Sequence, residues 1–212
     1  MTRKIILMCV VLLSLGGLAA QTDPPDPPQP QQAFVVEAVL TNVETGQTFV
    51  LPVTSRIENV GPDTYEAEHE IAIPQALLRA QVNEKSRYDG TRSALVTIHQ
   101  NFSETSSGGN RYVSVNYYKG KWEQLDPAVT ATKLQLNAAC LGDILGGGFC
   151  NYNTWSAQYS NPGEDSWYTY TPSWAGDYVV MTQLTHQSGA TKVWLKRGLS
   201  TWTFTVTVAE SD

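Results

Sequence analysis

The chain has 212 residues, of which 14 are basic and 20 are acidic, so its formal net charge is −6. An acidic chain without a run of basic residues is a poor partner for nucleic acid and for anionic membrane surfaces, and we expect neither as a ligand. The length suits a domain of ordinary size with a sizeable core.

The first 20 residues have the features of a secretory signal peptide. Arg3 and Lys4 give a positive start, residues 5–15 are apolar except for one serine, and residues 16–20 are mostly small. This pattern is typical of an export signal, and the apolar run is shorter than the roughly 20 residues that span a membrane. We therefore predict a secreted or cell-surface protein without a membrane span after cleavage, with an uncleaved anchor as the alternative. Cleavage removes the two basic residues, so 12 basic and 20 acidic residues remain and the formal charge becomes −8.

Residues 21–32 read QTDPPDPPQPQQ. Such a segment cannot bury apolar surface, and its prolines favour an extended polyproline II conformation. We predict a flexible spacer, with a ligand for a proline-recognising domain as the alternative. Residues 33–212 show no break in composition and are predicted to form one domain, although two small β subdomains that meet near Leu125 would also fit the sequence.

After the spacer the dominant pattern has a period of two, with β-branched and aromatic residues in short runs and turn residues between the runs. We expect strands, in chain order, over residues 33–40, 48–56, 65–73, 93–102, 111–118, 131–139, 166–170, 177–184, 192–196 and 200–208. The turn at residues 44–46 predicts that the first two strands form a hairpin. Residues 74–81 are the one helical passage, because a proline opens them and alanines and leucines follow.

Alternation is clearest in the final strand. Trp202, Phe204, Val206 and Val208 share one face of it, and threonines occupy the other. One-sided alternation is expected for an antiparallel sheet with one face in water. About ten short strands at this spacing predict an all-β fold, an antiparallel and jelly-roll-like β-sandwich with one short helix, with a closed β-barrel as the alternative.

Two cysteines, Cys140 and Cys150, remain after the signal peptide. An even number of cysteines in an exported chain indicates a disulfide. Closing the glycine-rich loop between them is worth roughly 3 kcal/mol in the chain-entropy model. A pair of free thiols at a redox or metal site is the alternative.

No catalytic motif stands out among the titratable residues. His69 falls on the apolar face of its strand, where a hydrogen-bonded and partly buried histidine is expected, whereas His99 falls on the face opposite to its apolar neighbours and His186 lies near the end of a strand. None of them has a second histidine at ligand spacing, and no serine lies between glycines as in a nucleophile elbow. We therefore lean against an enzyme and keep a secreted hydrolase, with carboxylates and a histidine gathered in space, as an alternative.

No cofactor is predicted, and calcium is the one metal that the acidic residues suggest. Calcium takes about 6–8 oxygen ligands, often from loops, and the turn that contains Glu164 and Asp165 is rich in oxygen atoms. Glu66, Glu68 and Glu70 form a second group, because they share one face of their strand. Neither group has the spacing of a known calcium loop, so no metal site is assigned.

The most unusual segment is residues 152–178, which hold eight of the 21 aromatic residues of the chain. These rings either form core and cross-strand pairs or include an exposed platform for a sugar or a protein. In the second interpretation the ligand-binding residues are Trp155, Trp167, Tyr168, Tyr170 and Trp174.

We hypothesise from these patterns a non-catalytic binding or interaction domain for carbohydrate or protein, which uses exposed aromatic residues and is held away from its surroundings by the spacer. A purely structural, envelope-associated protein is the third hypothesis beside the binding domain and the hydrolase. The fold by itself does not choose among the three, because one fold hosts many functions.

Overall fold

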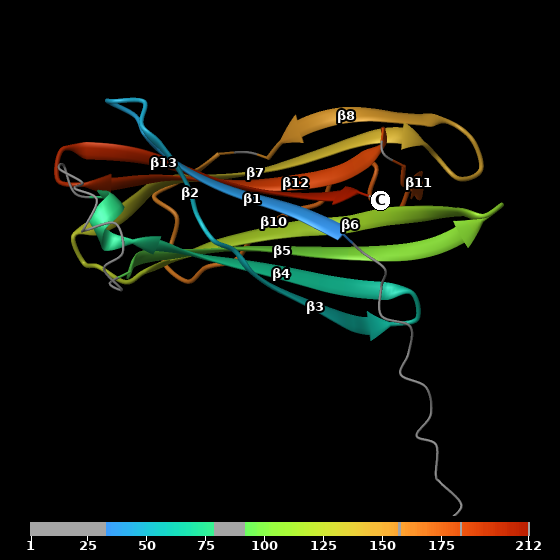
Figure 1. Cartoon of the computed structure of the whole chain (residues 1–212), viewed down its shortest axis with the longest axis horizontal. Helices are drawn as coiled ribbons and strands as arrows, with labels where there is room; N and C mark the ends of the chain where they lie inside the picture. Colours follow the sequence, from blue (N-terminus) through green and yellow to red (C-terminus); the bar gives the residue numbers. More distant parts are fainter. Residues whose placement is uncertain (1–32, 79–91, 157, 183, 212) are drawn as a thin grey trace, which may run out of the picture. The chain divides into compact units, whose positions relative to one another are not determined.

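A computed structural model of the chain describes residues 33–78, 92–156, 158–182 and 184–211. The predicted signal peptide (1–20) and spacer (21–32) lie outside the described residues. Within these ranges almost all regular structure is β, arranged as two antiparallel sheets that pack face to face (Figure 1). The predicted β-sandwich is confirmed, and the two sheets are not closed into a barrel.

The first sheet, sheet A, has seven strands in the described part of the chain. Its spatial order is β2 (Thr48–Val50), β1 (Ala33–Asn42), β13 (Ser200–Ser211), β12 (His186–Arg197), β7 (Val129–Asp143) and β8 (Phe149–Trp155), and β9 (Tyr159–Ser160) also pairs with β7. The first and the last strand of the described residues are therefore neighbours in one sheet.

The second sheet, sheet B, has six strands among the described residues. Its spatial order is β10 (Tyr168–Tyr170), β6 (Asn110–Gln124), β5 (Arg92–Ser107), β4 (Thr64–Pro74) and β3 (Thr54–Gly61), and β11 (Val179–Val180) also pairs with β6. Each strand from β3 to β6 pairs with the next one in the chain, so the centre of this sheet is an antiparallel meander.

The predicted strand over residues 48–56 is wrong in one respect, because its two halves belong to different sheets. β2 pairs with β1 for three residues, and the chain then crosses to sheet B, where β3 begins at Thr54. Leu51 is still held to sheet A by a hydrogen bond of 2.8 Å from its N–H to the carbonyl of Ala38. Pro52 follows and has no N–H to continue the ladder, which is a physical reason for the strand to end here.

The predicted helical passage at residues 74–81 is a single 3-10 turn, η1 (Gln75–Leu78), as far as the described residues extend. Leu77 and Leu78 are both buried in the hydrophobic core. The rest of the predicted helix, from residue 79 onward, lies outside the described residues. The turn thus covers one end of the core, as its apolar composition suggests.

The core lies between the two sheets and follows the alternation seen in the sequence. Trp202, Phe204, Val206 and Val208 of β13 are all buried, as predicted. Every second residue of β4, from Tyr65 to Ile73, is buried as well. Burial of these apolar side chains is the main stabilising term for such a sandwich, at about 25 cal/mol for each Å² removed from water.

Two glycines leave room for side chains of the opposite sheet. A Cβ atom added to Gly189 of β12 would lie 2.2 Å from a ring carbon of Tyr118 of β6, which is fully buried. A Cβ added to Gly120 would likewise lie 2.6 Å from the hydroxyl oxygen of Thr191. These glycines are required by space, because any side chain there would displace the opposite sheet.

The predicted disulfide is confirmed. Cys140 of β7 and Cys150 of β8 are bonded, with their Cα atoms 5.8 Å apart, and both are buried. The bond closes the loop that connects these two strands at one end of sheet A. No helix in the described part of the chain has the length and apolar character needed to cross a membrane.

Candidate functional site

The outer face of sheet B brings charged side chains from three neighbouring strands into one row. Glu68 of β4 lies opposite His99 of β5, and His99 lies opposite Lys119 of β6. Side chains of alternate residues point to the same face of a sheet. Because Ile98 is fully buried in the core, His99 and its two partners lie on the outer face.

Glu66 lies two residues before Glu68 on β4, on the same outer face, and its carboxylate contacts His99. The Nε2 atom of His99 lies 3.3 Å from Oε2 of Glu66. The hydroxyl of Tyr117 donates a hydrogen bond of 3.1 Å to Oε1 of Glu66, and the Nδ2 atom of Asn101 lies 3.4 Å from the same oxygen. Burial by itself raises the pKa of Glu66, but the electrostatic interaction with the neighbouring His99 and the hydrogen bonds to the carboxylate outweigh it and hold the pKa below its ordinary value. Glu66 is therefore kept as a carboxylate.

An exposed tryptophan lies beside this pair. Trp167 precedes β10 and is 42% exposed, and its ring meets His99 edge-on with the ring centroids 6.0 Å apart. The Nζ atom of Lys121 lies 5.3 Å from the centroid of the Trp167 ring, a cation–π contact. Lys121 is itself held by Glu123 at 2.6 Å and by Asp165 at 3.0 Å. The orientation of the ring is thus set by its neighbours.

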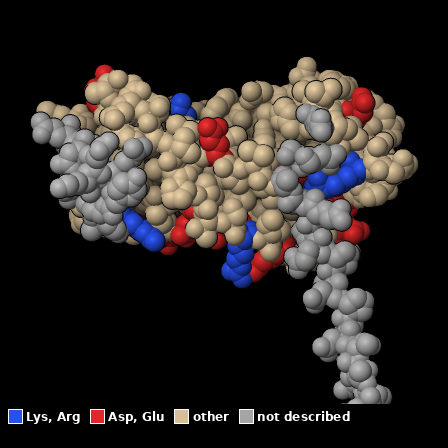
Figure 2. Space-filling view, viewed as in Figure 1, with Lys and Arg blue, Asp and Glu red and all other residues tan. Residues whose placement is uncertain are grey.

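Two adjoining hollows, of about 80 and 190 Å³, lie over these residues. Their lining forms what we call the His99 surface, which consists of Arg56, Glu58, Glu66, Glu68, His99, Lys119 and Trp167. Figure 2 shows acidic and basic side chains close together along the margin where Figure 1 draws sheet B. The surface is therefore polar, of mixed charge and open, with one aromatic ring.

Of the five aromatic residues predicted to bind a ligand, two are exposed. Trp167 belongs to the His99 surface, whereas Trp155 is 47% exposed on β8 of sheet A. Trp174 is 3% exposed, and Tyr152 stacks on it with ring centroids 5.1 Å apart, so Trp174 is a core residue and not part of an exposed platform. The exposed rings of this segment are therefore divided between the two sheets.

Tyr168 and Tyr170, the remaining two, are partly buried and pack against the core. Their hydroxyl groups are already used within the protein. The hydroxyl of Tyr168 accepts a hydrogen bond of 2.7 Å from the N–H of Gly163, and that of Tyr170 lies 2.7 Å from Oγ1 of Thr154. Both residues therefore serve the packing of the protein and are not part of an exposed platform.

The other histidines are not part of the His99 surface. His69 was predicted to be partly buried and hydrogen-bonded; it is fully buried, and its Nδ1 atom lies 2.8 Å from Oγ of Ser55. Burial, and to a lesser degree the charge of His99, lowers the pKa of His69 to about 4, so it is neutral at physiological pH. His186 begins β12 on the other sheet.

The predicted calcium ligands are placed next to this surface but do not gather into a metal site. The carboxylate of Asp165 is bound to Lys121, and Glu164 is exposed in the same turn. Among the described residues no cluster of three or more histidine, cysteine, aspartate or glutamate side chains could hold a metal ion. Calcium binding at Glu164 and Asp165 stays an untested prediction.

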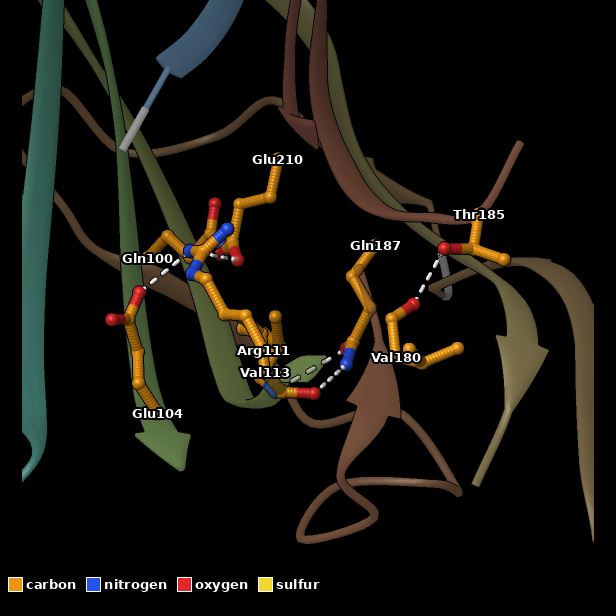
Figure 3. A network of polar contacts seen from close by, with 9 residues as sticks. Gln100, Glu104, Arg111, Val113, Val180, Thr185, Gln187 and Glu210 are labelled. Carbon is orange, nitrogen blue, oxygen red and sulfur yellow. Dashed lines mark hydrogen bonds and ion pairs between the residues drawn. The ribbon is translucent and has the colours of Figure 1, made fainter. Parts of the chain in front are cut away.

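A second polar cluster lies inside the sandwich and joins the two sheets (Figure 3). Glu210 of β13 is fully buried and accepts a hydrogen bond from Gln100 of β5. Arg111 of β6 lies 2.6 Å from Glu104 of β5 and 3.9 Å from Glu210. Burial in the first place, and the charge of Glu104, raise the pKa of Glu210 to about 8, although Arg111 and Gln100 act against this.

Gln187 of β12 extends this cluster. Its side-chain amide donates to the carbonyl of Val113 and accepts from the N–H of Val115, both on β6 (Figure 3). These bonds join β12 of sheet A directly to β6 of sheet B. We assign the buried cluster a structural role, because its hydrogen bonds join strands of the two sheets inside the sandwich.

The sequence analysis identified His99 and Trp167 but missed Arg56, Glu58 and Lys119 of the His99 surface. It also assigned Glu66 and Glu68 to a calcium group and not to a histidine. The available signal was the alternation on each strand, which places all of these side chains on outer faces. Comparison with models of known protein families, with curated proteins and with solved structures finds no match to this chain.

Proposed function

We propose that the protein is a non-catalytic carbohydrate-binding domain and that the His99 surface is its binding site. The observation that carries this proposal is the half-exposed ring of Trp167 beside a polar hollow with a fixed His99–Glu66 pair. Sugar rings present C–H groups that stack on aromatic faces, and hydroxyl groups that both donate and accept hydrogen bonds. Glu68 and Lys119 line the same hollow and supply an acceptor and a donor.

A carbohydrate fits this surface better than a protein partner does. Protein-binding hot spots are well-packed, desolvated pockets around aromatic or arginine anchors. The His99 surface is instead open, and it carries both acidic and basic side chains. Such a surface suits a neutral ligand that is rich in hydroxyl groups.

Binding also fits the chemistry better than hydrolysis does. A glycosidase needs a carboxylic acid with a raised pKa as its proton donor. Glu66 has a lowered pKa, because His99 and Tyr117 stabilise its charged form. No serine, threonine or cysteine is among the described residues that line the two hollows, so none of these can be named as a nucleophile there.

The proposed setting is outside the cell or on its surface. Its support is the predicted signal peptide together with the Cys140–Cys150 bond, since disulfides form and persist in oxidising compartments. In this setting the proline-rich residues 21–32 would act as a spacer between the binding domain and whatever precedes or surrounds it.

The test is a glycan array followed by titration calorimetry with the tightest glycan. We expect Trp167→Ala to weaken binding at least tenfold, which is about 1.4 kcal/mol. Trp194→Ala is the matched control, because Trp194 is a partly exposed tryptophan on the outer face of sheet A, and it should bind as the wild type does.

Two results would overturn the proposal. One is the absence of glycan binding by the folded wild-type protein. The other is unchanged affinity in both Trp167→Ala and Glu68→Gln. Release of product from the bound glycan would instead favour the hydrolase, and loss of that activity in His99→Gln would place it at this surface.

A further inference from the structure

β8 (Phe149–Trp155) is an edge strand that lacks the usual protection against pairing. In the described part of the chain it pairs with β7 on one side and with no strand on the other, along the upper margin of sheet A in Figure 1. Proteins normally protect such edges by short length, charged residues or proline. The seven residues of β8, FCNYNTW, contain neither a charge nor a proline.

The other exposed edges in the described residues are protected. β2, β9, β10 and β11 have two or three residues each. The part of β1 before Ala38 has no described strand on its outer side, but it carries the exposed charge of Glu37. β3 is longer, but it carries the ion pair of Arg56 and Glu58. β8 is thus the one described edge that is long and also uncharged.

The orientation of the β8 backbone shows which groups are free to pair. The N–H of Ser156 donates a bond of 2.8 Å to the carbonyl of Leu136, in the register that joins β8 to β7. Because the backbone groups of successive residues point to opposite sides of a strand, those of even-numbered residues face β7. The N–H and C=O groups of Phe149, Asn151 and Asn153 therefore face the free edge, together with those of Trp155.

The side chains of these four residues lie on the outer face of sheet A. Cys150 points inward, since it is buried in its disulfide, and Tyr152 points inward to stack on Trp174. Their neighbours must then point outward. Phe149 is 57% exposed and Trp155 is 47% exposed, so two large apolar rings stand at the two ends of an unpaired strand.

We propose that the protein forms a two-fold symmetric dimer in which β8 pairs antiparallel with β8 of a second copy, centred on Tyr152. In this register Phe149 lies opposite Trp155 of the second copy, and Asn151 lies opposite Asn153. Aromatic rings then meet aromatic rings and amides meet amides, which are favourable cross-strand pairs. The four outward-facing residues of each copy can exchange about eight backbone hydrogen bonds.

The occupant is a second copy because the strand is complementary to itself. An isologous two-fold interface requires that one surface match its own image. The order aromatic, asparagine, tyrosine, asparagine, aromatic along residues 149, 151, 152, 153 and 155 reads the same in both directions. No charged residue of β8 would face a like charge, although each copy is acidic as a whole.

The first measurement is the molar mass of the purified protein by sedimentation and light scattering over a range of concentrations. We expect a dimer, and Asn151→Pro should weaken dimerisation at least tenfold. Proline removes the N–H that faces the free edge but leaves the pairing with β7 in place. Trp167→Ala, on sheet B, is the control that should remain dimeric, so this result is independent of the proposed carbohydrate site.

Cross-linking tests the register directly. Asn151→Cys combined with Asn153→Cys places the two new thiols opposite each other across the interface, within the Cα separation of about 4.4–6.8 Å that a disulfide needs. Asn151→Cys alone leaves its two copies on a diagonal of about 7–8 Å and should cross-link poorly. Peptide mapping identifies the bond that joins residue 151 to residue 153.

Several results would overturn the proposal. They are a wild-type monomer at every concentration, a dimer that is unaffected by both Asn151→Pro and Trp155→Lys, and cross-links at other positions. Circular dichroism and thermal unfolding establish that each variant is folded. Pairing of β8 with a strand of a different protein, while this chain alone stays monomeric, would also refute the dimer.

Discussion

Glu210 is the residue whose replacement should change the pH dependence of stability most clearly. Its carboxyl group is fully buried between the sheets and is hydrogen-bonded by Gln100 (Figure 3). Its pKa rises from the ordinary value of 4.5 to about 8. Because the folded protein holds this proton more tightly than the unfolded chain does, the free energy of unfolding falls as pH rises from 4.5 to 8.

The size of the effect follows from the pKa. At about 1.4 kcal/mol for each pKa unit, the rise to about 8 corresponds to a loss of up to about 5 kcal/mol across the whole range. His69 acts in the opposite direction, because its lowered pKa of about 4 makes the protein less stable as pH falls below 6.5. Between pH 6.5 and 8 the effect of Glu210 is larger than that of His69. We expect the free energy of unfolding to fall by about 2 kcal/mol over this range.

The assay is urea unfolding followed by tryptophan fluorescence at several pH values between 6.5 and 9. Glu210→Gln keeps an acceptor for Gln100 but cannot ionise, so its unfolding free energy should be nearly constant over this range and exceed that of the wild type at pH 9. Glu37→Gln, at an exposed position on the neighbouring strand β1, is the control and should follow the wild type. A wild-type stability that is flat from pH 6.5 to 8, or a variant that retains the slope, would refute this assignment.

Two further predictions concern packing and the disulfide. Gly189→Ala should lower the free energy of unfolding by about 2–3 kcal/mol, because the added Cβ would overlap the buried ring of Tyr118. A decrease of less than about 0.5 kcal/mol, measured by urea unfolding, would contradict the close approach of the two sheets at this position. Replacing Cys140 and Cys150 together by alanine should cost about 3 kcal/mol in the same assay, because the open loop regains its conformational entropy. A double variant as stable as the wild type would show that the bond does not constrain the unfolded chain.

Much of the fold was predictable because it depends on local alternation. The inward residues of β13, including Trp202 and Phe204, were identified from a period of two and are buried in the structure. The course of residues 48–56 was not predictable in this way. Pro52 indicates a break in a strand, but a break does not say to which sheet the following residues belong.

The candidate site was predictable only in part. Alternation placed His99 on an outer face, and composition singled out Trp167 among the rings. Their contact depends on β10 pairing with β6, which lie about 50 residues apart in the chain. Trp174 was predicted to be a ligand-binding residue because it lies in a polar segment, but it is buried in the folded protein, where Tyr152 stacks on it.

The sequence by itself determined which side chains alternate between core and solvent, and which two cysteines could pair, since only Cys140 and Cys150 remain after the predicted signal peptide. The tertiary structure alone decided which strands are neighbours. This order of strands brings Glu66, His99 and Trp167 together and leaves β8 at the edge of its sheet. The physical reason is that backbone hydrogen bonds are the same for every residue pair. Neighbouring strands are therefore selected by long-range packing of the two sheets, which no short stretch of sequence contains.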